Sequence, residues 1–249
     1  MAAFPDHFSG RAAEYARFRP LYPAPLFDFL ARLSPDRHRA WDCATGNGQA
    51  ALGLARHFGR VVATDASLRQ IARATAHQRI GYIAAAAEDA PLGSGSVALV
   101  TAAQALHWFE RDRFWQEARR VLVPGGIVAV WCYHGFHCTP EVERVVHRYY
   151  GEIVGRYWPP ERALVERGYG TLEFPFAEER APAFRLEKRW DLAAMFGYLK
   201  TWSATQRYEA VVGRDPLESI EGELSDAWGP AEEVRPFRWD LDLRIGRNG

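Results

Sequence analysis

The residues best suited to chemistry begin with a short glycine-containing stretch, Trp41-Asp42-Cys43-Ala44-Thr45-Gly46-Asn47-Gly48-Gln49. Glycines at a strand-to-helix turn let a ligand approach bare backbone, and the helix behind the turn offers unpaired amides to an anionic group. Asp65 lies nineteen residues after Gly46, where a carboxylate at the end of the next strand can accept hydrogen bonds from both hydroxyls of a ribose. The spacing therefore indicates a site for a nucleoside-containing cofactor.

The loop by itself leaves three interpretations open. Gly46, Gly48 and Ala51 satisfy the G-x-G-x-x-A pattern of a dinucleotide site. A strand, turn and helix with incidental glycines would need no ligand at all. Asp42 points to a third interpretation, because a carboxylate inside the first strand can meet a cationic amino group such as that of a methionine moiety.

A second group of polar and aromatic residues follows a later apolar run, residues 97–103. It consists of Gln104 and the triplet His107-Trp108-Phe109. Ligands of open α/β sheets bind at the carboxyl ends of the strands, which places Gln104 under a cofactor. His107 and Trp108 form the candidate catalytic pair, with His107 as a general base because imidazole titrates near neutral pH. The alternative is that both residues simply cap the strand.

Strands and helices that alternate from residue 40 to residue 133 position both groups. Apolar runs predict strands at 40–44, 60–66, 82–87, 97–103 and 127–133. Helices are expected at 49–58, from the N-cap residue Ser67 to residue 78, and at 111–122. This alternation predicts an α/β fold with a Rossmann-like, doubly wound and mostly parallel sheet.

The rest of the chain is expected to form an N-terminal arm and a lid within the same single domain. The arm and its helix span residues 1–39: residues 1–25 are too aromatic for disorder, and a helix is predicted at 24–33. Residues 134–230 are rich in aromatics and prolines, with helices expected at 141–151 and 192–205, and are interpreted as a substrate lid. Alternating patterns at 184–190 and 234–245 predict the two closing strands, and the segment 231–249 holds an antiparallel last strand.

In their order along the chain, these motifs resemble the class I S-adenosylmethionine-dependent methyltransferases. The resemblance is clear over residues 4–133, where it is carried by the glycine loop, Asp65, the segment Ala87-Glu88-Asp89-Ala90-Pro91-Leu92 and the turn Pro124-Gly125-Gly126. Three further segments are similar to the trans-aconitate methyltransferase-like branch of methyltransferase type 11: Phe8-Ser9 through Tyr15, Arg19-Pro20-Leu21-Tyr22-Pro23 and Gln104-Ala105-Leu106-His107-Trp108-Phe109.

Two positions depart from the family pattern. Ala44 stands at the first glycine of the loop, and Ala86 stands where many relatives bind the adenine amino group with an acidic residue. These departures bear on affinity for the cofactor rather than on the fold.

The resemblance implies S-adenosylmethionine as methyl donor and S-adenosylhomocysteine as product. It implies that Asp42 holds the methionine amino group and Asp65 the ribose diol. Tyr15 and Arg19 would close over the cofactor, unless the arm merely packs on the surface. The full expected cofactor set is Asp42, Ala44, Thr45, Gly46, Gly48, Gln49, Asp65, Ala66, Ala87, Glu88, Gln104, Tyr15 and Arg19.

The predicted function is methyl transfer to a small molecule, with a carboxylate that becomes a methyl ester as the first candidate acceptor. A carboxylate is ionised at neutral pH and needs no base, whereas a phenol or an amine would use His107. Three alternatives stay open. They are an O-, N- or C-methyltransferase of natural products, a nicotinamide-dependent oxidoreductase that uses the same loop, and a non-catalytic methyltransferase fold used for binding.

Composition and charge favour a cytoplasmic enzyme that acts as a monomer or homodimer. The 31 Lys and Arg residues balance the 31 Asp and Glu residues, so no long-range field attracts nucleic acid or an anionic membrane. No signal peptide or apolar stretch of about 18 residues is present. Cys43, Cys132 and Cys138 lack the spacing of a disulfide framework. The spacing of His134, His137 and Cys138 matches no zinc pattern, so no metal is expected.

Overall fold

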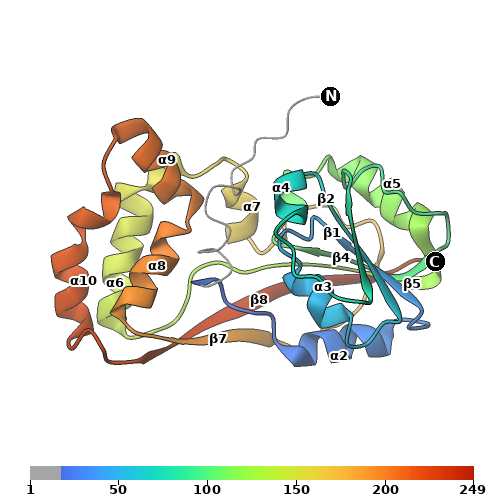
Figure 1. Ribbon diagram of the computed structural model, residues 1–249, viewed down its shortest axis with the longest axis horizontal. Coiled ribbons are helices and arrows are strands. Elements are labelled where there is room, and N and C mark those ends of the chain that lie inside the picture. Colours follow the sequence, from blue (N-terminus) through green and yellow to red (C-terminus); the bar gives the residue numbers. More distant parts are fainter. Residues whose placement is uncertain (1–17) are drawn as a thin grey trace.

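The computed structural model describes residues 18–249, and its first half alternates strands with helices around a central sheet (Figure 1). The strands of this half are β1 (Arg39–Cys43), β2 (Arg60–Asp65), β3 (Ile80–Ala84), β4 (Val97–Ala103) and β5 (Leu122–Cys132). The helices are α2 (Ala24–Leu33), α3 (Gln49–Leu54), α4 (Leu68–Ile71), the short η2 (Leu106–Trp108) and α5 (Arg111–Val121).

The sheet has the order β3-β2-β1-β4-β5-β8-β6, and the strands from β3 to β5 run parallel. Strand β8 (Arg235–Arg247) pairs antiparallel with β5, and the short β6 (Ala177–Glu178) pairs antiparallel with β8. The predicted Rossmann-like fold, mostly parallel with an antiparallel last strand, is therefore confirmed.

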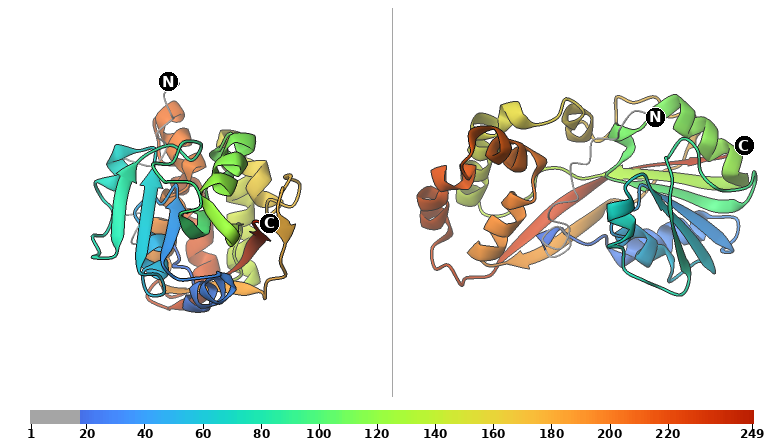
Figure 2. Two further views of the ribbon diagram at one scale, coloured as in Figure 1. Left: turned by 90° about the vertical axis from the view of Figure 1, so that its right-hand side faces the viewer. Right: turned by 45° about the horizontal axis from the view of Figure 1, so that its top comes forward.

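Alternate residues of the central strands point to opposite faces of the sheet and belong to two hydrophobic cores, one on each face. Ala40 of β1 and Leu99 of β4 pack with α2 and α3, whereas Trp41 and Val100 pack with α5 on the other face. Six of the seven residues of β4 are fully buried, because helices cover both faces of a parallel sheet. Figure 2 shows this layering in two further views.

Two helices of this half are shorter than the sequence predicts, because tertiary hydrogen bonds compete for their last turns. The helix expected at 49–58 ends at Leu54 as α3, and the amide of Gly59 already bonds to the Arg37 carbonyl at 2.9 Å. The helix expected after Ser67 ends at Ile71 as α4, since the Thr75 carbonyl accepts a hydrogen bond from the Tyr82 hydroxyl at 2.9 Å. Strand β3 correspondingly begins two residues before the predicted 82–87.

The second half of the chain builds a helical lobe beside the sheet, to the left in Figure 1. Its helices are α6 (Pro140–Arg148), the π-helical η3 (Tyr149–Ile153), α8 (Leu192–Lys200), α9 (Ser203–Val212), η5 (Pro216–Ser219) and α10 (Glu221–Trp228). The short η4 (Gly155–Tyr157) packs against η3 and α9, and α7 (Arg162–Glu166) lies between the lobe and the sheet. Among residues 18–249, no helix has the length and apolarity needed to cross a membrane.

A long β-ribbon connects the helical lobe to the sheet. The first half of β8 pairs with β7 (Phe184–Trp190), and its second half pairs with β5. Both predicted closing strands are present, and β7 joins the sheet only through the first half of β8. The alternation of residues within β8 does not show that its two halves pair with different strands, β7 and β5.

One helix expected in this half, 192–205, is two helices, α8 and α9. Two threonine hydroxyls donate hydrogen bonds to backbone carbonyls in the last turn of α8. The Thr201 hydroxyl donates to the Tyr198 carbonyl at 2.6 Å, and the Thr205 hydroxyl donates to the Leu199 carbonyl at 2.9 Å. Such side-chain bonds compete with the helical ladder. The chain therefore turns at Trp202 and restarts as α9.

Candidate functional site

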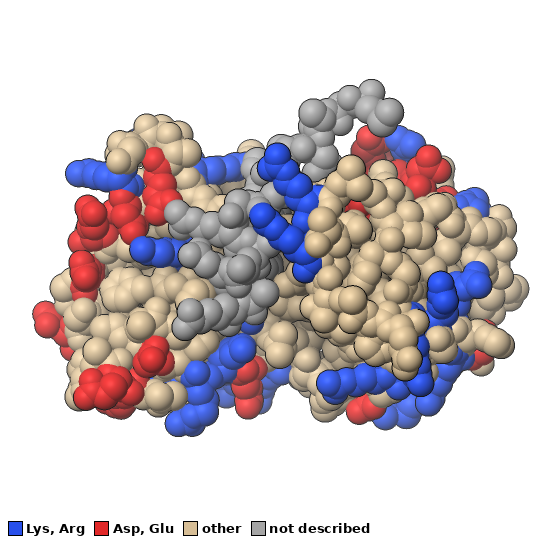
Figure 3. Space-filling model, viewed as in Figure 1, with Lys and Arg blue, Asp and Glu red and all other residues tan. Residues whose placement is uncertain are grey.

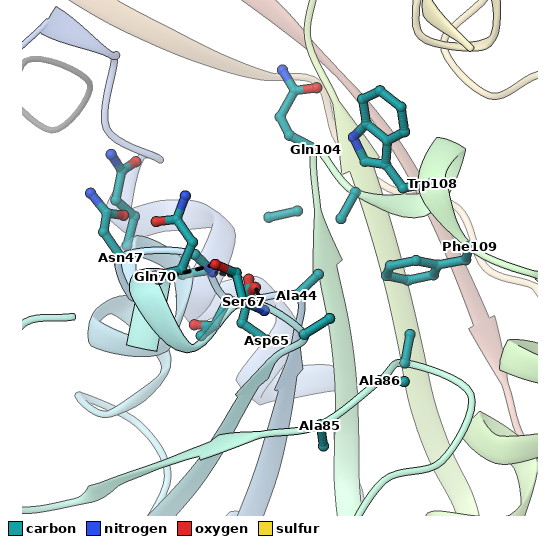
Figure 4. A pocket seen from close by; sticks show the side chains of 18 of the residues that line it. Ala44, Asn47, Asp65, Ser67, Gln70, Ala85, Ala86, Gln104, Trp108 and Phe109 are labelled. Atoms are coloured by element: carbon teal, nitrogen blue, oxygen red, sulfur yellow. Dashed lines mark hydrogen bonds between the residues drawn. The ribbon is translucent and has the colours of Figure 1, made fainter. Parts of the chain in front are cut away.

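A cavity lies at the carboxyl ends of β1, β2 and β4, and we call it the loop cavity (Figure 4). Ten of the predicted cofactor residues line it: Arg19, Ala44, Thr45, Gly46, Gln49, Asp65, Ala66, Ala87, Glu88 and Gln104. Two others, Asp42 and Gly48, do not line it. Tyr15 lies outside the described residues.

The backbone of the glycine loop leaves open space where side chains would otherwise stand. Gly46 has φ +57°, and a Cβ added there would meet no atom within 4 Å, so the loop presents bare backbone to the cavity. Gly48 has φ +89°, and a Cβ there would collide with the Tyr82 hydroxyl. Ala44 also adopts a left-handed φ, +51°, which explains why glycine is the usual residue at this position.

The carboxylate of Asp65 is held at the rim of the loop cavity by two backbone amides. Its Oδ2 accepts a hydrogen bond from the Gly46 amide at 2.9 Å, and its Oδ1 accepts one from the Ser67 amide at 2.8 Å. The carboxylate therefore connects the glycine loop to the start of α4, where Ser67 is the N-cap. Each oxygen of a carboxylate can accept more than one hydrogen bond, so a diol can bind to the same group.

Asp42 lies outside the lining of the loop cavity. Its side chain is completely buried (0% exposed). The hydroxyls of Thr45 and Thr101 donate to its two carboxylate oxygens, and the amide of Ala51 in the first turn of α3 also bonds to it. The carboxylate therefore lies under the loop and supports the start of α3, and its contact with a methionine amino group stays a prediction.

A second cavity, which we call the aromatic cavity, lies between the sheet and the helical lobe. It adjoins the loop cavity, and four residues line both: Arg19, Gln104, Trp108 and Tyr133. Other aromatic or charged residues that line it include His107, Tyr150, Trp158, Arg162, Tyr198 and Trp202. The two cavities together can hold two ligands side by side.

Comparisons with known proteins decide the family. The family model described as a methyltransferase domain matches residues 41–130. A protein of Dictyostelium discoideum that is named as a methyltransferase is 32% identical over 229 residues, which cover 90% of this chain and 87% of the relative. The chain belongs to the class I S-adenosylmethionine-dependent methyltransferases.

Solved structures agree with this assignment. A structure described as a type II methyltransferase from Anaeromyxobacter dehalogenans is 47% identical, with a TM-score of 0.87 over 93% of this chain and 98% of that one. A Saccharomyces cerevisiae protein named as an S-adenosylmethionine-dependent methyltransferase is 27% identical over 172 residues, 64% of this chain and 59% of the relative.

Several residues that line the loop cavity of this methyltransferase were not predicted from the sequence. Asn47, Ser67, Gln70 and Phe109 are among them, and Figure 4 shows their side chains around the same space as Asp65. Asn47 and Phe109 stand inside motifs that were recognised, so position in the motif was an available signal. Ser67 and Gln70 lie at the cavity because the Ser67 amide bonds to Asp65, and a sequence pattern does not reveal this contact.

Glu88 lines the loop cavity, and one of its carboxylate oxygens is hydrogen bonded to the backbone of another segment. Its Oε1 accepts a hydrogen bond from the amide of Glu110 at 2.9 Å, at the start of α5. Ala85, Ala86 and Ala87 line the cavity beside it. Small side chains at these three positions leave room for a flat ring next to the backbone.

His107 lines the aromatic cavity rather than the loop cavity, and Trp108 lines both. The Nδ1 of His107 is hydrogen bonded to the hydroxyl of Tyr169 at 2.8 Å. Burial, with the nearby charge of Arg162, lowers the pKa of His107 from 6.5 to about 3. The ring therefore stays neutral and is a weak proton acceptor, so the expected role as a general base is not supported by its surroundings.

Arg162 of α7 is a cation in the aromatic cavity that the sequence did not single out. Its guanidinium packs over the rings of Trp158 and Tyr150, at 4.7 and 5.5 Å from their centroids. Its Nε donates to the Tyr150 hydroxyl at 2.8 Å. Within residues 18–249, its two terminal nitrogens have no hydrogen-bond partner. The aromatic rings thus hold the guanidinium while its outer edge is left for a ligand.

No group of three or more His, Cys, Asp or Glu side chains in the described part of the chain could hold a metal ion. His134 and His137 instead face carboxylates: His134 lies 3.7 Å from Asp242, and His137 lies 3.6 Å from Asp240. Both carboxylates belong to β8.

Proposed function

We propose that this methyltransferase binds S-adenosylmethionine in the loop cavity and transfers its methyl group to a small carboxylate-bearing acceptor in the aromatic cavity. The observation that carries the proposal is that the two cavities adjoin and share Arg19, Gln104, Trp108 and Tyr133. Holding donor and acceptor next to each other in a fixed orientation supplies much of the rate of a group transfer.

The residues of the loop cavity fit the cofactor part by part. The Asp65 carboxylate suits the ribose diol, and the bare backbone at Gly46 admits the methionine part without a clash. The small residues 85–87 and the ring of Phe109 offer an apolar slot for adenine. The name of the yeast relative supports the same cofactor.

The bound cofactor supplies an electrophilic methyl group: a lone pair of the acceptor oxygen forms the new O–C bond while the C–S bond breaks and its electron pair goes to sulfur. No proton moves when the acceptor is a carboxylate. The chain therefore needs only to align the acceptor and to exclude water. Trp108, which lines both cavities, is placed to do so at the boundary between them.

Two guanidinium groups of the aromatic cavity support a carboxylate acceptor. The two carboxylates that also line it, Glu143 and Glu166, already accept hydrogen bonds from the Cys138 amide and the Tyr150 hydroxyl. Arg162 approaches from α7, and Arg19 approaches from the N-terminal side, with its guanidinium over the Tyr198 ring and its Nη2 bonded to the Thr201 carbonyl at 3.2 Å. Arginine binds carboxylates with a planar pair of donors. The aromatic rings around them suit an acceptor with a flat or apolar body.

The surface supports a small acceptor. On the face shown in Figure 3, basic and acidic side chains lie in small interspersed groups, in keeping with 31 positive and 31 negative residues in the chain. A nucleic-acid site would need a continuous basic surface.

Methyl transfer from labelled S-adenosylmethionine to a panel of aromatic carboxylates, aliphatic dicarboxylates, phenols and amines tests the proposal. Faster labelling of carboxylates, with products that are cleaved by mild alkali as esters are, would support it. Labelling confined to phenols or amines would replace the carboxylate with the natural-product alternative. Binding of NAD in place of the sulfur compounds would indicate an oxidoreductase.

A further inference from the structure

The hydroxyl of Tyr169 is a buried group that the cofactor chemistry does not use. Tyr169 follows α7, and its side chain is completely buried (0% exposed). Burial raises its pKa well above the usual range, so the phenol keeps its proton. Its hydroxyl lies 2.8 Å from the Nδ1 of His107.

The direction of this hydrogen bond follows from the surroundings of the Tyr169 oxygen. The backbone amides of His107 and Leu106 lie close to that oxygen and partly offset the rise in its pKa, so N–H dipoles already face it. Within the described residues, the Nδ1 of His107 is the acceptor available to the buried O–H. A buried hydroxyl without an acceptor is costly, and the O–H therefore points at Nδ1.

This direction fixes the tautomer of the imidazole. A neutral imidazole carries one proton, and a nitrogen that accepts a hydrogen bond cannot carry it. With Nδ1 accepting from Tyr169, the proton resides on Nε2. His107 lines the aromatic cavity, so the nitrogen left for a ligand there is a donor.

We propose that His107 donates a hydrogen bond from Nε2–H to the methyl acceptor, and that Tyr169 is the positioning residue that fixes this tautomer. The inference rests on the proposed function and deepens it. An Nε2–H cannot remove a proton, so the acceptor must arrive as an anion. It can hold one oxygen of a carboxylate while the other oxygen attacks the methyl carbon. The site is thereby selective for carboxylates over neutral phenols and amines.

The backbone at Tyr169 is consistent with a residue kept in place for this purpose. Tyr169 has φ +60°, a left-handed conformation that a tyrosine adopts only at a cost. The carbonyl of the same residue accepts a hydrogen bond from the Arg244 guanidinium at 3.1 Å. The surrounding structure thus holds the strained residue where its hydroxyl reaches His107.

Nitrogen NMR of the complex with S-adenosylhomocysteine tests the tautomer directly. Protein labelled with ¹⁵N-histidine is compared with His107→Gln, whose missing signal assigns the ring, and with Tyr169→Phe. We expect a protonated Nε2 and a bare Nδ1 in the native enzyme and a mixture of tautomers in Tyr169→Phe. Tyr149→Phe is the matched control, because Tyr149 is also buried and its hydroxyl bonds to Thr205 at 2.8 Å. A protonated Nδ1 in the native enzyme would overturn the proposal.

Kinetics with the best carboxylate of the panel test the role of the donor. We expect His107→Leu to lower kcat about 100-fold and His107→Gln, which keeps an N–H, to lower it less than about 10-fold. Tyr169→Phe should lower kcat about 10-fold, and Tyr149→Phe should leave it unchanged. The kcat of the native enzyme should be flat between about pH 6 and 9, whereas a general base would make it fall at the acid end. Equal losses in the Leu and Gln variants would refute the donor role.

These outcomes separate the inference from the proposed function. If the native enzyme binds S-adenosylhomocysteine and methylates no carboxylate, the proposed acceptor class is wrong and so is the selectivity derived from His107. The NMR result still decides the tautomer in that case. If carboxylates are methylated and Nδ1 carries the proton, the proposed function stands and the inference fails.

Discussion

The buried carboxylate of Asp42 should make the stability of this methyltransferase depend on pH. Complete burial raises the pKa of Asp42 from 3.8 to about 6, although hydrogen bonds from Thr45, Thr101 and Ala51 offset part of the effect. The folded state therefore binds this proton more tightly than the unfolded chain. The corresponding stability is fully present below about pH 4 and is lost as the pH rises through 6.

The size of the effect follows from the two pKa values. Each pKa unit corresponds to about 1.4 kcal/mol, so the change from 3.8 to about 6 amounts to about 3 kcal/mol. Asp42→Asn is neutral at every pH, because it keeps one oxygen acceptor and replaces the other oxygen with an NH2 group. The hydroxyls of Thr45 and Thr101 can rotate to satisfy both, since a hydroxyl donates and accepts. The variant should therefore gain about 3 kcal/mol relative to the native protein between pH 4 and pH 8.

Urea unfolding followed by circular dichroism at several values between about pH 4 and pH 8 measures this difference. Asp226→Asn serves as the control, because Asp226 is exposed on α10. We expect the difference between native and Asp42→Asn proteins to change steadily up to about pH 6 and then to level off. Parallel pH profiles for the native protein and Asp42→Asn would show that Asp42 titrates normally and would refute the reasoning.

Three further substitutions test the two cavities and the loop. Asp65→Ala should raise the Kd of S-adenosylhomocysteine, measured by calorimetry, about 100-fold, because hydrogen bonds to a charged group contribute about 1.5–3 kcal/mol each. A rise in Kd of less than about 3-fold would contradict this role of Asp65. Arg162→Gln should raise the KM of a carboxylate acceptor at least about 10-fold. The control Arg167→Gln changes an exposed neighbouring arginine and should leave KM unchanged. Equal effects of the two substitutions would argue against Arg162 as the anion site. Ala44→Gly should raise the free energy of unfolding by up to about 1 kcal/mol, since relief of a left-handed alanine exceeds the entropy cost of glycine; a lower Tm would contradict this.

The fold of the cofactor half could be predicted from the sequence because local patterns decide it. The strand at 97–103 and the helix at 24–33 have the bounds that their apolar patterns predict. Both are short runs with clear ends, and both are buried by their neighbours in the chain. The order of motifs then places the glycine loop and Asp65 at one edge of the sheet, where the structure has them.

The burial of Asp42 could not be predicted in the same way. The sequence shows a carboxylate in a strand next to a glycine loop, which suits both a ligand contact and a structural role. The decision depends on Thr101, which is fifty-nine residues away and reaches Asp42 across the β1–β4 pair at 2.7 Å. Residues that meet only through sheet pairing leave no local signal.

The aromatic cavity was the least predictable part of the site. Arg162 and Tyr169 come from a segment with no recognisable motif, and they reach His107 only because α7 packs beside η2. The sequence indicated that aromatic residues gather after residue 134. It did not show which of them pack in the core and which face a ligand, because that depends on the β7–β8 ribbon and the break between α8 and α9.

The most direct test of the whole account is titration calorimetry of the native protein with S-adenosylmethionine and S-adenosylhomocysteine, with NAD as the comparison ligand. The account predicts that both sulfur compounds bind with micromolar Kd, that Asp65→Ala weakens this binding about 100-fold, and that NAD does not bind. Absence of binding by either sulfur compound, or binding of NAD in the same cavity, would contradict it.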